Sequence, residues 1–263
     1  MLSFAVTAYN ELSEPQQHGQ RILDCISAAQ HHPAIDEIIV VDDGSEDYPE
    51  LSALLANQPK VSLHHYYPNR GVFTNKIEAV ALASNNWVIN SDSDNLMDTA
   101  YIDHVISMKR DPLTWYCPSF AKPQFDYRGL VGRYDIDTIK DFFQTPIAAC
   151  AINTGNEIVY RPEYMRVLGR FHGVRRFDLI LPNYLGLQEE ERLEEQWHLV
   201  YGACDSILLN MEWLKAGGTL EFCEGLEYEH AVHVDKSGSN YDRAPAAKEL
   251  LAAILRQRLV EGA

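Results

Sequence analysis

The first hundred residues alternate short apolar runs with amphipathic segments, and this alternation constrains the fold more than any other feature of the sequence. Ser13 and Gln16 predict a capping box at the start of the first helix. Strand, helix and strand in this order imply right-handed crossovers and a parallel sheet. We therefore predict an α/β fold, with a mostly parallel central sheet flanked by helices and a Rossmann-like N-terminal half. The strand-like runs are at 2–8, 37–45, 61–65 and 87–90, and helical patterns lie near 51–56 and 74–83.

Acidic residues follow two of these apolar runs. Asp42 and Asp43 end the second run, and Asp92 and Asp94 follow "WVIN". In parallel α/β sheets ligands bind beyond the carboxyl ends of the strands, so a ligand is expected at these acids. Two carboxylates one residue apart can hold a divalent cation that bridges a diphosphate, although such acids can also cap a helix or bind water. The "DDGS" stretch also has two interpretations. It can form an Asx turn, or it can present a carboxylate to a nucleotide base that stacks on Tyr9.

The balance of charge argues against polyanionic partners. The 263 residues include 22 Lys and Arg but 38 Asp and Glu, which gives a formal charge of −16. Nucleic acids and anionic membranes are bound by clustered basic residues. The five cysteines are widely spaced and form no C-x-x-C pair, so we expect reduced thiols. Neither a signal peptide nor a run long enough to cross a bilayer is visible. We expect a cytoplasmic protein with no nucleic-acid partner and no integral membrane segment.

The second half of the sequence is less regular. Strands are predicted at "TWYCPSF", "NEIVY" and "LEYEHAVHV", and helices at "IKDFF", "RPEYMRVL" and "CDSILLNMEWLKAGG". Because no repeat or linker is visible, we expect one domain over 1–263, with halves at 1–110 and 111–244 and an amphipathic helix at 245–263. The apolar stripe of that helix predicts core packing or a possible homodimer seam, and it comprises Leu250, Leu251, Ile254, Leu255 and Leu259.

Four N-terminal segments, taken together, carry a family resemblance. "FAVTAYNE", "IIVVDDGSED", "NRGVFTNKIEAVALA" and "WVINSDSDN" occur in the order and spacing typical of family 2 glycosyltransferases of the GT-A fold. The chain resembles that family over its first hundred residues and more loosely beyond them. The resemblance makes 1–110 the nucleotide-sugar-binding half and 111–244 the acceptor and catalytic half. It implies a metal-dependent, inverting transfer from a nucleotide-diphosphate sugar, with a UDP-sugar as the expected donor, to a hydroxyl of a glycan or other acceptor.

By the same resemblance, residues of the first half bind the donor. One group matches the segment that cradles base and ribose: Thr7, Tyr9 and Glu11. Asp43 matches the acid that reads the base. Arg70 and Asn75 fall in the segment that touches the nucleotide or donor, and Asp92 also belongs to the donor site.

The implied metal, Mn²⁺ or Mg²⁺, is expected at Asp94 and Asp92. Asn95 departs from the family, since many relatives have an acid at that position. His230 and His233 are further candidate ligands. If their segment is extended they point to opposite faces, so only one is expected to face the site, and a structural histidine remains the alternative for each.

Asp205 matches the family's catalytic base, which takes the proton of the acceptor hydroxyl. It begins the helix "DSILLNMEW", where a carboxylate is also favoured as an N-cap. The alternative that Asp205 only caps this helix and has no catalytic role therefore remains. Glu189, Glu190 and Glu191 are alternative acids in a stretch that is typical of a solvated helix.

Two other functions remain open from the sequence. A sugar-phosphate nucleotidyltransferase also uses an α/β sheet and Mg²⁺, but it would normally have a Gly-rich basic loop near the N-terminus, and "TAYNELSEP" has none. A catalytically inactive sugar-nucleotide-binding protein would bind UDP in a metal-dependent manner without turnover.

Overall fold

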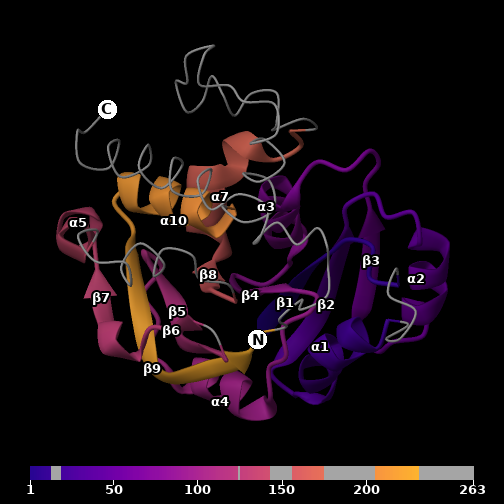
Figure 1. Ribbon diagram of the computed structural model, residues 1–263, viewed down its shortest axis with the longest axis horizontal. Coiled ribbons are helices and arrows are strands. Elements are labelled where there is room, and N and C mark those ends of the chain that lie inside the picture. The colour runs from indigo at the N-terminus through magenta and orange to yellow at the C-terminus, as the bar shows by residue number, and fades with distance from the viewer. Residues whose placement is uncertain (13–18, 124, 143–155, 175–204, 231–263) are drawn as a thin grey trace.

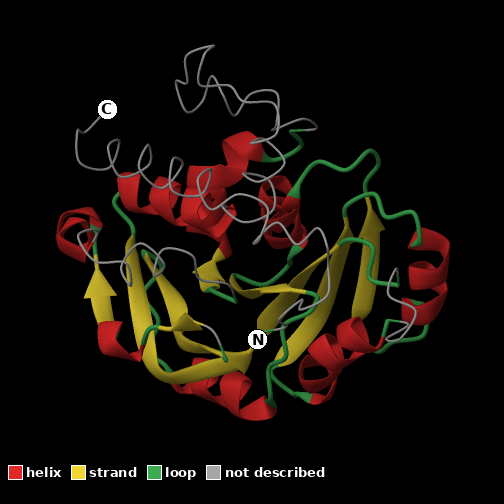
Figure 2. Ribbon diagram, in the orientation of Figure 1, coloured by secondary structure: helices red, strands yellow, loops and turns green. Residues whose placement is uncertain are grey.

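A computed structural model of the chain describes residues 1–12, 19–123, 125–142, 156–174 and 205–230, and its strands form a continuous sheet (Figures 1 and 2). The nine strands lie in the order β3-β2-β1-β4-β8-β5-β9-β7, with β6 paired to β5. They are β1 (Leu2–Ala8), β2 (Ile35–Asp42), β3 (Val61–His65), β4 (Trp87–Asp92), β5 (Thr114–Lys122), β6 (Phe125–Asp126), β7 (Gly132–Tyr134), β8 (Ile158–Tyr160) and β9 (Thr219–Glu229). The helices within the described ranges are α1 (Gln20–His31), α2 (Tyr48–Leu55), α3 (Val72–Leu82), α4 (Thr99–Ser107), α5 (Ile136–Phe142), α7 (Arg161–Leu168) and α10 (Asp205–Lys215).

The N-terminal half has the parallel strand–helix architecture that the sequence predicts. β3, β2, β1 and β4 are mutually parallel neighbours, and β1 and β3 have the predicted bounds. Helix α1 begins at Gln20, with Gly19 as its N-cap residue, and the predicted capping box of Ser13 and Gln16 lies outside the described residues. The crossovers confirm the α/β class.

The C-terminal half of the sheet is mixed. β8 is antiparallel to both β4 and β5, while β9 is parallel to β5 along most of its length. β7 and β6 run antiparallel to β9 and β5. Six of the nine strands therefore share one direction, which agrees with the mostly parallel sheet that the sequence predicts.

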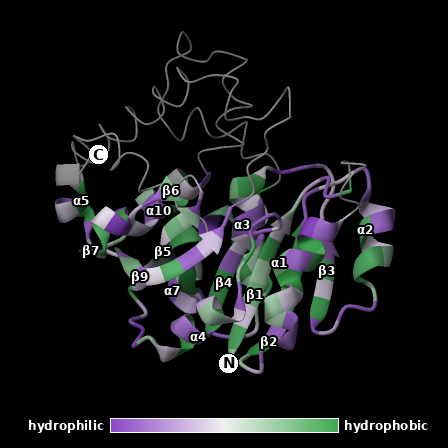
Figure 3. Ribbon diagram, turned by 60° about the horizontal axis from the view of Figure 1, so that its bottom comes forward, coloured by the Kyte–Doolittle hydropathy of each residue, from purple (hydrophilic) through white to green (hydrophobic). Residues whose placement is uncertain are grey.

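Hydrophobic side chains cover both faces of the sheet and make two cores. One core packs α3, α7 and α10 on one face, and the other packs α1, α2 and α4 on the opposite face (Figure 1). Along β2, Ile39 and Val41 face the first core, whereas Ile38 and Val40 face the second. This alternation explains why the strand is apolar throughout, since both of its faces are buried. Figure 3 shows hydrophobic segments along the central strands.

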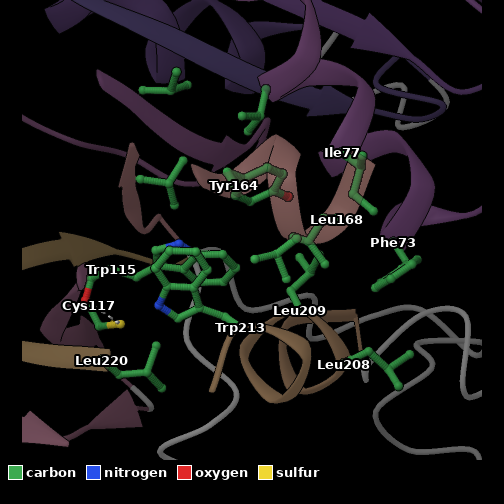
Figure 4. Packing of buried hydrophobic residues seen from close by; sticks show 14 of the residues in the cluster. Phe73, Ile77, Trp115, Cys117, Tyr164, Leu168, Leu208, Leu209, Trp213 and Leu220 are labelled. Atoms are coloured by element: carbon green, nitrogen blue, oxygen red, sulfur yellow. Dashed lines mark hydrogen bonds between the residues drawn. The ribbon is translucent and has the colours of Figure 1, made fainter. Parts of the chain in front are cut away.

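Stacked aromatic rings seat α10 against the sheet (Figure 4). The ring of Trp213 stacks on that of Trp115 with centroids 4.9 Å apart, and Trp115 stacks in turn on Tyr164 at 5.3 Å. The indole N–H of Trp213 donates to the carbonyl oxygen of Thr219 over 3.0 Å. A Cβ at Gly218 would lie 2.2 Å from the Trp213 ring, so only glycine fits there. Burying each ring contributes about 1.5–3 kcal/mol, so the stack anchors the C-terminal part of α10 to the sheet.

Helix α4 was not predicted from the sequence, although its start has a clear signal. Asp98 is its N-cap, and the Asp98 carboxylate accepts a hydrogen bond from the Tyr101 backbone N–H at 2.9 Å. This acid, close in sequence to Asp92 and Asp94, therefore has a capping role.

Two expectations from composition can be compared with the described residues. Cys25 and Cys223 are buried free thiols, as the reduced state requires, and Cys150 and Cys204 lie outside the described ranges. No helix in those ranges is both long enough and apolar enough to span a membrane.

Candidate active site

Three parallel strands end beside one another at the sheet edge where the sequence predicts a ligand. β1 ends at Ala8, β2 at Asp42 and β4 at Asp92. The strand register pairs Ala8 with Asp42 and Thr7 with Asp92. Acidic side chains from two segments far apart in the sequence are therefore brought to one edge.

Asp42 holds the turn that follows β2. Its buried carboxylate accepts hydrogen bonds from the Ser45 backbone N–H at 3.1 Å, from the Ser45 hydroxyl, and from Nδ1 of His65 at 2.7 Å. Gly44 has φ 82°, and a Cβ there would lie 2.8 Å from the backbone nitrogen of Asn69. The turn therefore needs glycine at this position, and the Asx-turn interpretation applies to Asp42.

Asp43 is buried and is held by backbone donors. Its Oδ1 accepts from the Arg70 N–H at 2.9 Å and its Oδ2 from the Gly71 N–H at 2.7 Å. Burial raises the pKa of Asp43, and these two N–H groups and the Arg70 charge limit the rise. Each carboxylate oxygen has a second lone pair, so Asp43 retains the capacity to accept from a base.

Arg70 and Asn75 lie buried behind this turn. The Arg70 guanidinium donates to Oε1 of Glu78 at 3.2 Å and lies 3.7 Å from Oδ1 of Asp43. The side-chain amide of Asn75 donates to the carbonyl oxygen of Val41 at 3.0 Å. Both side chains contact the end of β2 and the residue that follows it. Their contact with a nucleotide stays a prediction.

A buried lysine joins the acid of β4 to the acid that opens α10. Nζ of Lys76 lies 3.1 Å from Oδ1 of Asp92 and 2.6 Å from Oδ2 of Asp205. The Thr7 hydroxyl donates to the same Asp92 oxygen over 3.0 Å. Lys76 is 3% exposed and Asp205 7%, whereas the Asp92 side chain is 32% exposed. One ammonium group therefore contacts both Asp92, which is predicted to bind the donor and the metal, and Asp205, which is predicted to be the base.

The electrostatics of this cluster favour a charged lysine. Burial lowers the pKa of Lys76, but the carboxylates of Asp205, Asp92 and Glu157 outweigh burial and hold it well above its usual range. Burial raises the pKa of Asp92, and the nearby carboxylates add to the rise, while Lys76 opposes it. A protonated Lys76 between two carboxylates is the arrangement that offsets their repulsion.

Glu11 lies beside the "SDS" turn, and Tyr9 is at the surface. The Ser93 hydroxyl donates to Oε1 of Glu11. Burial raises the pKa of Glu11 to about 7; the charge of Asp94 adds to the rise, and the Ser93 hydrogen bond opposes it. The Tyr9 ring is 52% exposed at the end of β1, as a platform for a base would be.

Asn95 connects the turn after β4 to the end of β9. Its Oδ1 lies 3.0 Å from Nδ1 of His230, and its Nδ2 donates to Oδ1 of Asn156 at 3.0 Å. Reciprocal backbone bonds between Leu96 and Glu229, at 2.8 and 2.9 Å, fix the same junction. His230 therefore lies next to Asn95, which follows the predicted metal motif, and its role as a metal ligand stays a prediction. His233 lies outside the described residues.

The described residues can supply part of the coordination shell of a divalent metal ion. Asp92 and Asp94 supply the oxygen ligands that Mg²⁺ and Mn²⁺ prefer, and a diphosphate and water can complete such a shell. No group of three His, Cys, Asp or Glu side chains gathers for metal binding within the ranges that the structure describes. The donor set thus suits a site that is completed by a substrate rather than a cage made only of protein ligands.

Sequence reasoning missed Lys76, although a signal existed. Lys76 comes three residues after Phe73 and four before Val80, on the buried face of α3. A lysine inside an apolar stripe indicates a buried cation, and a buried cation needs carboxylate partners. The alternative acids at 189–191 and the helix at 245–263 lie outside the described residues.

Comparison with known proteins identifies the family. Residues 3–215 match the model of Glycosyl transferase family 2. This match covers most of the chain, so the chain belongs to family 2 of the glycosyltransferases. No curated protein sequence matches it.

Solved structures show the same fold at low sequence identity. The mannosyltransferase PcManGT from Pyrobaculum calidifontis, in complex with GDP-Man and Mn²⁺, superposes with a TM-score of 0.55 and 15% identity, covering 97% of this chain and 69% of that one. TarS 1–349 from S. aureus, in complex with UDP-GlcNAc, superposes with a TM-score of 0.53 and 13% identity, covering 97% of this chain and 66% of that one. These likenesses establish the GT-A fold.

Proposed function

We propose that this glycosyltransferase is a metal-dependent, inverting enzyme that moves a sugar from a UDP-sugar to an acceptor hydroxyl in the cytoplasm. The observation that carries the proposal is the cluster of Asp92, Lys76 and Asp205. It joins the strand edge that binds donors in such folds to an acid from the second half of the chain. An acid at each side of one site is what a transfer between two substrates requires.

The choice of UDP is supported by the chemistry around Asp43. A buried carboxylate in its charged form accepts a hydrogen bond, and the ring N–H of uracil donates one. Guanine also offers a ring N–H, whereas cytosine and adenine present a lone pair at the corresponding ring nitrogen. Tyr9 would support the base, and Thr7 and Glu11 would lie near the ribose. GDP is therefore the competing donor nucleotide.

Asp92 and Asp94 would hold Mn²⁺ or Mg²⁺, with His230 or His233 as additional candidate ligands. When bound, such an ion offsets the negative charge that develops on the departing nucleoside diphosphate. The oxygen donors at the end of β4 support this assignment, and so does the 32% exposure of Asp92.

Asp205 would act as the general base. Its carboxylate accepts the proton of the acceptor hydroxyl while that oxygen forms a bond to the anomeric carbon. The bond from the anomeric carbon to the diphosphate breaks on the opposite side, so the configuration inverts. The rigid seat of α10 supports this role, because a general base must be held at a fixed position.

The test is a panel of UDP-, GDP- and other nucleotide sugars with the full chain, in Mn²⁺, in Mg²⁺ and in EDTA. Release of nucleoside diphosphate is followed in each case. We expect metal-dependent turnover with a UDP-sugar and an inverted linkage in the product. Retention of configuration, or equal turnover in EDTA, would overturn the mechanism. Metal-dependent UDP binding without turnover of any donor would instead support an inactive sugar-nucleotide-binding protein.

A further inference from the structure

Lys76 is a buried cation whose ammonium contacts two carboxylates, those of Asp92 and Asp205. It lies on the same side of α3 as the buried Phe73 and Val80, and its aliphatic stem is enclosed there. Burying an unpaired ammonium costs several kcal/mol, so the position is tolerated only with partners. Those partners come from β4 and from α10, which are far apart in the sequence. The lysine thus connects the two halves of the proposed site.

Within the ranges that the structure describes, the side-chain partners of Asp205 meet at its Oδ2. Oδ2 of Asp205 lies 2.6 Å from Nζ of Lys76, and the Ser206 hydroxyl donates to the same oxygen over 3.4 Å. The carboxylate is therefore oriented by an ion pair at Oδ2, while α10 itself is fixed by the Trp213 stack.

We propose that Lys76 is a positioning residue for the transfer step: its ammonium fixes Oδ2 of Asp205, so that Oδ1 is the oxygen that takes the proton of the acceptor hydroxyl. This inference rests on the proposed function. Because the same ammonium contacts Asp92, the base has a defined place relative to the donor side of the site. A misplacement of about 1 Å can reduce a rate by about a hundredfold, so this single contact has a large kinetic effect.

A double-mutant cycle tests the proposal with four proteins: wild type, Lys76→Met, Asp205→Asn and the double variant. We expect Lys76→Met to lower kcat by about a hundredfold, while the Kd for UDP with metal stays close to the wild-type value. In the Asp205→Asn background, Lys76→Met should lower kcat no further, since the residue acts through Asp205. Lys76→Arg keeps the charge and should recover part of kcat.

The matched control is Lys60→Met. Lys60 precedes β3, at the opposite end of the sheet, and its Nζ donates to the carbonyl oxygen of His32 at 2.8 Å. This variant should keep wild-type kcat. Melting curves of all proteins separate loss of positioning from loss of fold. If Lys76→Met does not fold, the cycle is run with Lys76→Arg, and a smaller but equally non-additive loss is expected.

Two outcomes would overturn the inference while leaving the proposed function intact. One is full kcat in Lys76→Met beside an inactive Asp205→Asn. The other is an equal further loss on adding Lys76→Met to Asp205→Asn, which would show that the lysine acts elsewhere. Full transfer by Asp205→Asn would instead overturn the proposed base, and with it the premise of this inference.

Discussion

Two groups of carboxylates border the same sheet edge, and their charges are offset by different means; we call the surroundings of Asp43 the first pocket and those of Asp92 and Asp205 the second pocket. At the end of β2, Asp43 accepts from the backbone N–H groups of Arg70 and Gly71, at 2.9 and 2.7 Å. At the end of β4, Asp92 shares the side-chain ammonium of Lys76 with Asp205. Backbone N–H groups are partial charges fixed by the fold, whereas the lysine ammonium is a full charge that two carboxylates share.

This difference matches the tasks proposed for the two pockets. A base-reading carboxylate does the same thing in every turnover, so a rigid backbone cradle suits it. The acids near the transferred sugar meet a metal ion, a diphosphate and an acceptor in turn, and their charge balance changes as each binds. A shared side-chain cation offsets the charge of Asp92 and Asp205 together during that sequence. We therefore expect substitutions in the second pocket to affect kinetics and substitutions in the first to affect stability.

The largest expected effect is that of Asp205→Asn in the second pocket. Asparagine keeps the shape but accepts no proton, so transfer should fall by about a hundred- to ten-thousandfold. UDP affinity should stay nearly unchanged, and the loss of stability should be limited because Lys76 keeps its ion pair with Asp92. Steady-state transfer and calorimetry measure this, with Glu163→Gln in the first turn of α7 as the control. Full transfer would mean that Asp205 is a helix cap only.

Asp94→Ala should abolish the metal-dependent part of UDP binding. The remaining affinity in Mn²⁺ should equal the affinity in EDTA, and stability should hold or rise slightly, because one of several adjacent carboxylates is removed. Calorimetric titration with UDP, with and without metal, gives the answer. Asp103→Asn on α4 is the control, since that side chain is 71% exposed. An unchanged metal-dependent affinity for UDP would show that Asp94 is not a metal ligand.

The second pocket also shows where sequence reasoning stops. Local patterns predict the strands and the acids at their ends, because period, length and turn residues are encoded within a few positions. The pairing of Lys76 with Asp205 joins α3 to α10, and no local pattern encodes such a contact. The early start of β9 at Thr219 has the same origin, since its register with Thr114 on β5 is set by non-local pairing.

Arg70→Met tests the first pocket. The guanidinium pairs with buried Glu78 and lies 3.7 Å over the Tyr66 ring, so its loss leaves a buried carboxylate without this cation. Breaking one side of such a pair typically costs about 3–5 kcal/mol. Urea unfolding measures the loss. Arg128→Met removes an exposed pair with Asp126 and should lower the free energy of unfolding far less than Arg70→Met does. Equal losses in the two variants would contradict the buried-network interpretation.

The smallest expected effect concerns Glu11, whose carboxylate accepts a hydrogen bond from the Ser93 hydroxyl. Its pKa is about 7 in the folded chain and near 4.5 when unfolded, chiefly because of burial. Between these values the folded chain keeps a proton that the unfolded chain releases, so stability falls as pH rises from 4.5 to 7, by at most about 3 kcal/mol. Glu11→Gln removes this contribution and should flatten the stability profile in that window, relative to wild type. Urea unfolding at pH 5, 6, 7 and 8 measures both profiles. Parallel profiles for the two proteins would show that Glu11 is ionised throughout and that the turn after β4 is more hydrated than its burial implies.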